Sequence, residues 1–179
     1  MPSIDSPLVR SYWEAAERYR SAILAAPQRT LGQFLREVEP ALALLYSAAA
    51  ELPEIAPDTD GLADKRADRD AYRKLQGSVA KLLGRFDAYQ DIFNPSDPAD
   101  HTPVQYLLSL ELGEILEDLD EGRSLSDPSR SVAQADVLWQ LRFDFTSHWG
   151  RHAVSALKVI NALLHREAVD VLEFRRADA

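Results

Sequence analysis

Apolar residues recur three and four positions apart along most of the chain, which is the spacing of amphipathic helices. The first such stretch begins near Ser6, with Pro7 at the first helical position, where proline is favoured. The second begins at Thr30, and Thr30 with Gln33 has the pattern of a capping box, in which each side chain satisfies one free backbone N–H. Pro40 lies inside this second stretch and is expected to kink the helix or split it.

Three further helices are predicted downstream. The third runs from about Leu62 to Phe86, after a proline- and aspartate-rich loop. The fourth runs from about Thr102, as its cap, to Asp120. The last is a long central helix that ends near His165. The pattern therefore predicts an all-α antiparallel bundle of about five helices, forming a single domain over residues 1–179, with a core of about 8–165 and a C-terminal tail of 166–179.

Composition narrows the function classes. The chain has no cysteine, which excludes disulfides, thiolate metal sites and cysteine nucleophiles. Its net charge is -9, whereas nucleic-acid-binding proteins usually carry a basic patch, so no nucleic-acid partner is expected. No stretch has the roughly 20 apolar residues of a membrane span, and the N-terminus has no signal-peptide pattern. We therefore expect a cytoplasmic protein with no membrane association.

A polar strip interrupts the apolar face of the central helix. At 100° per residue, Asp144, His148 and His152 are predicted to stack on three successive turns. One interpretation is a hydrogen-bonded network that sets the helix register. The other is half of a metal site, because two histidines four residues apart can both bind zinc or iron through imidazole nitrogens. Acid–base catalysis is a third use of the same residues.

The fourth helix carries a row of carboxylates, namely Glu111, Glu114, Asp118 and Glu121. Such a row is typical of the solvated face of an amphipathic helix. It also suggests divalent-cation binding, and Glu111 is the carboxylate expected to complete a site with the two histidines.

A second candidate site lies before a proline-ended turn, where Tyr89, Asp91 and Asn94 occur among large apolar residues. Trp149 of the central helix is grouped with them. The segment is interpreted either as an aromatic plug over one end of the bundle or as a functional loop on a rigid scaffold.

Several short motifs together resemble one protein family. They are Leu45-Tyr46, Leu52-Pro53, Leu83-Gly84, Tyr89-x-x-x-Phe93-x-Pro95 and Phe145-x-x-His148-Trp149-Gly150-x-His152-Ala153. Over about residues 8–165 the chain resembles a bacterial family known as domain of unknown function 5063. The resemblance implies an all-helical bacterial protein of this size, and it implies no activity, cofactor or catalytic residue.

Three functional hypotheses follow. The first is a non-catalytic protein that binds a partner protein or a small ligand through one end of the bundle, with no cofactor expected. The second is a metal-binding bundle, with a metal-dependent hydrolase as its catalytic form, in which His148, His152, Asp144 and Glu111 surround a divalent metal. The third is a ribonuclease of the helical toxin type that would use Arg142 with His148.

Overall fold

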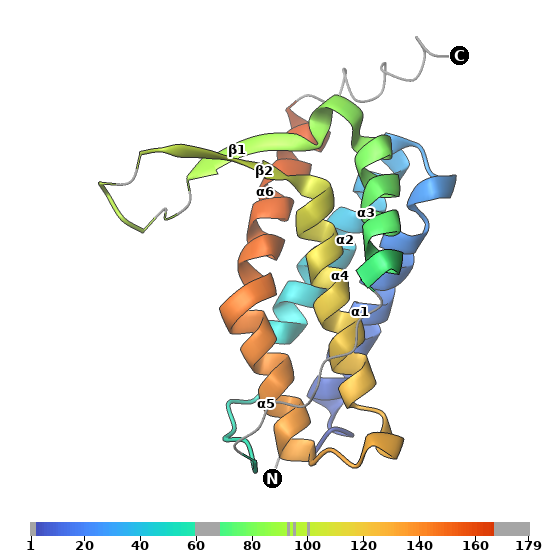
Figure 1. Cartoon of the computed structure of the whole chain (residues 1–179), viewed down its shortest axis with the longest axis vertical. Coiled ribbons are helices and arrows are strands. Elements are labelled where there is room, and N and C mark those ends of the chain that lie inside the picture. Colours follow the sequence, from blue (N-terminus) through green and yellow to red (C-terminus); the bar gives the residue numbers. More distant parts are fainter. Residues whose placement is uncertain (1–2, 60–68, 93, 95, 100, 167–179) are drawn as a thin grey trace.

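The computed structural model describes residues 3–59, 69–92, 94, 96–99 and 101–166 (Figure 1). Its α-helices are α1 (Pro7–Leu24), α2 (Leu31–Ala50), α3 (Arg69–Leu83), α4 (Leu108–Leu125), α5 (Gln134–Asp144) and α6 (Gly150–His165). A π-helical turn, η4 (Phe145–Trp149), joins α5 to α6 without a break. Short 3-10 turns lie at η1 (Ala26–Gln28), η2 (Gly84–Phe86) and η3 (Pro128–Arg130). The chain is therefore mostly helical, with α5, η4 and α6 acting as one long segment.

The helices pack side by side around one apolar core. α1 packs on α2, α2 on α6, α3 on α4, and α4 on α6. α4 and the α5–α6 segment run antiparallel. Glu111, early in α4, pairs with His152, whereas Asp118, later in α4, pairs with the earlier His148. The polar residues of α4 and α6 thus face each other along the bundle.

Both predicted helix starts in the first half of the chain are confirmed. The Ser6 hydroxyl accepts a hydrogen bond from the Val9 N–H, with Pro7 in the first turn. At α2, Thr30 and Gln33 form the reciprocal capping box. These contacts are local, so the sequence contains all the information they need.

Pro40 was expected to kink or to split the second helix, and the split is wrong. α2 continues from Leu31 to Ala50 across Pro40, whose ring is exposed on the surface of the helix. The missing N–H costs one hydrogen bond. Residues on both sides of the proline, including Val38 and Ala41, are fully buried, and this packing holds the helix together.

The purely all-α prediction is corrected by a β-hairpin. Strand β1 (Ala88–Ile92) pairs antiparallel with β2 (Pro103–Leu107). Figure 1 shows the hairpin reaching sideways from the end of the bundle where α3 and α4 are joined. Thr102 and Pro103 therefore do not start a helix, because the following residues pair with β1 instead.

The fourth helix begins at Leu108 and receives its cap from across the hairpin. The Asp87 carbonyl accepts from the Leu108 N–H at 2.8 Å. The Asp87 carboxylate accepts from the Ser109 N–H at 2.7 Å and from the Ser109 hydroxyl at 3.0 Å. Asp87, 22 positions before Ser109, thus provides the N-terminal cap that the sequence pattern assigned to Thr102.

Two predictions fall partly outside the described residues. The expected third helix begins within residues 60–68, and α3 is described from Arg69 onward. The C-terminal tail, apart from Arg166, also lies outside the described part of the chain. Among the described helices, none combines the length and apolar character needed to cross a membrane.

Candidate metal centre

The π-helical turn η4 contains His148 and lies directly before Gly150. The Gly150 N–H bonds to the Phe145 carbonyl, five residues back rather than four. A Cβ atom at Gly150 would lie 2.5 Å from that carbonyl oxygen and 3.1 Å from the Phe145 ring. Glycine is therefore required here by its own helix rather than by an approaching neighbour.

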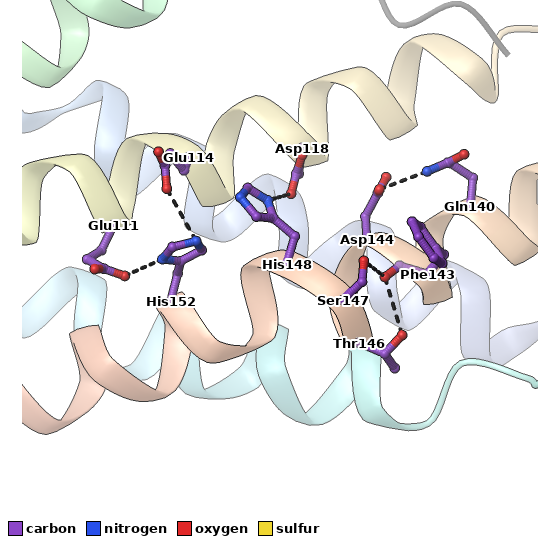
Figure 2. Close-up of polar contacts among 10 residues, drawn as sticks. All are labelled: Glu111, Glu114, Asp118, Gln140, Phe143, Asp144, Thr146, Ser147, His148 and His152. Carbon is purple, nitrogen blue, oxygen red and sulfur yellow. Dashed lines mark hydrogen bonds and ion pairs between the residues drawn. The ribbon is translucent and has the colours of Figure 1, made fainter. Parts of the chain in front are cut away.

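The Asp144 carboxylate pairs with Gln140, whereas the two histidines meet carboxylates of α4, so a place for Asp144 in the metal site stays a prediction. The Asp144 Oδ1 atom accepts a hydrogen bond from the Gln140 side chain at 2.7 Å. His148 and His152 remain one turn apart, with ring centroids 4.8 Å apart and planes at 78°. Figure 2 shows Asp144 directed toward Gln140 and the two imidazoles directed toward α4.

Each histidine is held at one ring nitrogen by a carboxylate of α4. The Nδ1 atom of His148 lies 2.6 Å from the Asp118 Oδ2 atom. The Nδ1 atom of His152 lies 2.5 Å from the Glu111 Oε2 atom. An imidazole whose Nδ1–H donates to a carboxylate has its lone pair on Nε2, the tautomer that binds metals through that atom.

Glu114 brings a third group to the same point. Its Oε2 atom lies 3.3 Å from the His152 Nε2 atom. One ligand atom from each of Glu114, His148 and His152 lies within 4.8 Å of the others. The His152 Nε2 atom is buried and has no hydrogen-bond partner among the described residues. Figure 2 shows the three side chains converging between α4 and the segment formed by η4 and α6.

The donor set suits a transition metal. Two imidazole nitrogens and one carboxylate oxygen form a set found in zinc and non-haem iron enzymes. A tetrahedral ion with bonds of about 2.1 Å holds its ligand atoms about 3.4 Å apart. The His152–Glu114 separation of 3.3 Å already matches this edge. The His148 side chain is 42% exposed and that of Glu114 is 31% exposed, so an ion can enter from this side.

The candidate metal centre is built from five residues, namely Glu111, Glu114, Asp118, His148 and His152. The sequence prediction did not include two of them, Glu114 and Asp118. Glu114 and Asp118 were visible only as part of a carboxylate row on the fourth helix. The residues Glu111, Glu114 and Asp118 are spaced by three and four, so they form one stripe that matches the His148–His152 spacing on an antiparallel neighbour. The sequence prediction took only Glu111 from this stripe to complete a site with the histidines, although the spacing places Glu114 and Asp118 on the same face.

The second candidate site is not assembled as a single cluster. Tyr89 and Asp91 lie on β1, and the Asp91 Oδ1 atom accepts from the Lys158 ammonium group at 2.9 Å. Asn94 lies beyond the strand and its side chain accepts from the Ser96 hydroxyl at 2.6 Å. Trp149 is instead buried in the helical core.

Tyr89 nevertheless lies next to the histidine cluster. Its hydroxyl oxygen is buried and forms no hydrogen bond that meets normal geometry with the described residues. Burial, followed by the negative charge of Glu111, raises the pKa of Tyr89 well above its ordinary value. The phenol is therefore neutral, and it lies beside the carboxylate that holds His152.

Arg142 has a structural role away from His148. Its guanidinium donates to the Ala50 carbonyl at 2.7 Å and to the Ala49 carbonyl at 3.3 Å, at the C-terminal end of α2. It also pairs with Glu54 at 3.2 Å. A cation is favoured at this end of a helix. The ribonuclease hypothesis paired Arg142 with His148, and these contacts direct the two side chains to different partners.

A protein-family model matches most of the chain. The family model described as domain of unknown function (DUF5063) matches residues 4–166. The chain belongs to the DUF5063 family. The resemblance carried by the histidine, tryptophan and glycine motif is thereby confirmed. No curated protein matches this DUF5063 chain.

A solved structure is also similar. The crystal structure of protein BF1032 from Bacteroides fragilis matches with a TM-score of 0.73 and 18% sequence identity. The match covers 89% of this DUF5063 chain and 94% of that chain. At this identity the likeness shows the fold alone.

Proposed function

We propose that this DUF5063 protein binds a divalent transition-metal ion through Glu114, His148 and His152. The observation that carries the proposal is the buried Nε2 atom of His152, which faces a carboxylate oxygen at 3.3 Å and has no hydrogen-bond partner among the described residues. Buried polar atoms in folded proteins are rarely left without a partner. A metal ion between the two atoms would satisfy both.

The surrounding carboxylates support this interpretation over a simple polar network. Glu111 and Asp118 each hold the Nδ1 atom of one histidine, which is the carboxylate–histidine–metal arrangement of many metalloproteins. The arrangement orients the rings and makes their Nε2 atoms more basic. The Glu111 side chain is only 6% exposed, so its position is set by packing.

The donor atoms narrow the choice of metal. Imidazole nitrogen suits zinc, iron, copper and nickel, whereas magnesium and calcium prefer oxygen ligands. The absence of cysteine removes the thiolate alternative. We therefore expect zinc or iron(II) to bind more tightly than manganese, and magnesium to bind weakly.

Three protein ligands leave a coordination position open, as in catalytic zinc sites. The exposed side of His148 gives solvent access to that position. A metal ion there would lower the pKa of a bound water toward 7, which favours hydrolysis. We propose metal-dependent hydrolysis as the catalytic form of this function, to be tested with p-nitrophenyl acetate and p-nitrophenyl phosphate as probes after metal loading.

The decisive test is metal content. Untagged protein is analysed by inductively coupled plasma mass spectrometry beside the variants His148→Ala/His152→Ala and His101→Ala/His165→Ala. The chain has four histidines, so the second variant removes the same number of imidazoles outside the proposed site. Wild type and control should contain stoichiometric metal, and the first variant should contain none.

Titration of metal-free protein completes the test. Zinc and anaerobic iron(II) should raise the Tm of the wild type and of the control, but not of His148→Ala/His152→Ala, because ligands that bind only the folded state stabilise it. Metal-free wild type whose Tm ignores both ions would overturn the proposal. Binding of a partner protein or a small ligand, the first hypothesis from the sequence, would then take precedence.

A further inference from the structure

A cavity of about 450 Å³ lies between the β-hairpin and α6. This volume falls in the range of small-molecule pockets. Ile92 and Tyr106 line it from the hairpin, and Val154 lines it from α6. These side chains offer an apolar surface to a ligand body.

The charged groups of the cavity are paired, with one exception. Asp91 pairs with Lys158 at 2.9 Å, and Glu111 pairs with His152. Partial burial opposes ionisation of Asp91, but hydrogen bonds from Lys158 and from the Ile92 N–H outweigh it and lower the pKa of Asp91. Arg151 also lines the cavity, and it forms no ion pair or side-chain hydrogen bond with any residue that the structure describes.

An unpaired guanidinium beside an apolar surface has a specific complement. Arginine presents parallel N–H donors that match a carboxylate in two-point contact. In a chain of net charge -9, an anion is repelled by most of the surface, so a cavity for an anion needs such a local cation. Ser155, one helical turn after Arg151 in the sequence, also lines the cavity with its hydroxyl group.

We propose that this cavity binds a small amphipathic carboxylate, with its charged end on Arg151 and its apolar body against Ile92, Tyr106 and Val154. The cavity shares Glu111 and His152 with the candidate metal centre, whereas Glu114 and His148 do not line it. The ligand therefore lies beside the metal ligands rather than on the metal. The inference holds whether or not the chain binds a metal.

The test compares a charged and a neutral competitor of nearly equal shape for their ability to displace a fluorescent dye from the cavity. Full-length protein in EDTA is titrated with 8-anilinonaphthalene-1-sulfonate, an aromatic anion that fluoresces when shielded from water. The bound dye is then displaced with 4-phenylbutyrate or with its neutral analogue 4-phenyl-1-butanol. The carboxylate should displace the dye at roughly tenfold lower concentration or better, since a hydrogen bond to a charged group is worth this much.

Variants locate the binding site. Arg151→Ala should remove the preference for the carboxylate, whereas Arg18→Ala, which removes an equal charge from the exposed face of α1, should preserve it. Ser155→Trp should fill the cavity and abolish dye binding, with circular dichroism confirming that the variant is folded. Equal displacement by both competitors, or dye binding unchanged in Arg151→Ala and Ser155→Trp, would overturn the inference. Because EDTA is present, a failed metal titration leaves this result unaffected.

Discussion

The Nε2 atom of His152 lies 3.3 Å from the Glu114 Oε2 atom without forming a hydrogen bond. The other nitrogen of the same ring is engaged by Glu111 at 2.5 Å. If Glu111 holds the ring proton on Nδ1, Nε2 and the Glu114 oxygen are both acceptors. Two acceptors that face each other inside a protein form an unfavourable pair, which a metal ion would turn into a favourable one.

The variant Glu114→Gln tests this relationship directly. An amide can donate a hydrogen bond to Nε2, so metal-free Glu114→Gln should be more stable than metal-free wild type by about 1 kcal/mol. Metal affinity should fall sharply, because a neutral amide is a weaker ligand. Urea unfolding in EDTA and zinc titration measure the two effects. A less stable metal-free variant would indicate instead that the wild-type pair is a protonated imidazole facing a carboxylate.

Glu111→Gln should weaken metal binding without removing a ligand. Groups that orient a metal-bound histidine typically contribute 10- to 100-fold in affinity, so a loss of about that size is expected with unchanged stoichiometry. Isothermal titration calorimetry with zinc measures it. Glu117→Gln is the matched control on α4, because it removes an equal charge from a residue whose charge acts on Tyr72. An equal loss in both variants would mean that only the overall charge matters.

Gly150→Ala should destabilise the protein although alanine favours helices. Propensity alone would stabilise the variant by about 1 kcal/mol. The added Cβ would lie 2.5 Å from the Phe145 carbonyl oxygen, and this oxygen belongs to the backbone. We expect a net loss of about 1–3 kcal/mol from overpacking, together with weaker metal binding as the π turn shifts His148.

Gly77→Ala provides the control for that substitution. Gly77 also lies in a helix, α3, but no atom lies within 4 Å of the Cβ it would gain. Its urea midpoint should rise, while that of Gly150→Ala should fall. A rise in both would show that the π turn tolerates a side chain.

Asp87→Ala should lower the stability of α4. Removing the carboxylate leaves the Ser109 N–H without its cap, which typically costs about 1 kcal/mol. Asp87→Asn retains an acceptor oxygen and should lose only part of this. Chemical denaturation of the three proteins gives the ranking. Equal stability of wild type and Asp87→Ala would contradict a capping role.

Alkaline pH should unfold the protein as its buried tyrosines ionise. Burial raises the pKa of Tyr12 and of Tyr19, and the Tyr19 hydroxyl donates to the Leu112 carbonyl at 2.8 Å. A folded-state pKa above the unfolded value contributes stability that is complete below about pH 10 and is lost as the pH rises further. Tyrosinate absorbance at 295 nm and helical circular dichroism should therefore change together for these residues. Their ionisation in a still-helical protein would contradict this expectation.

Local patterns in the sequence determined the helical character of the chain and several of its details. The capping box of Thr30 and Gln33 and the cap at Ser6 depend on residues three positions apart, so they can be read without a tertiary structure. The pairing of His148 with His152 on one face is equally local, because residues four apart are neighbours on a helix.

Tertiary packing decided the features that the sequence patterns did not predict. Residues 103–107 form a strand because 88–92 pair with them, and Asp87 then caps α4 in place of Thr102. In the π turn before Gly150 the backbone hydrogen bond reaches five residues back rather than four, and a fixed rotation of 100° per residue cannot represent it. Likewise the carboxylates of α4 reach the two histidines only because α4 packs antiparallel to the α5–α6 segment. These carboxylates belong to Glu111, Glu114 and Asp118. Hydrophobic periodicity tells which face of a helix is buried, but the choice of the helix that covers it depends on how all the helices pack together.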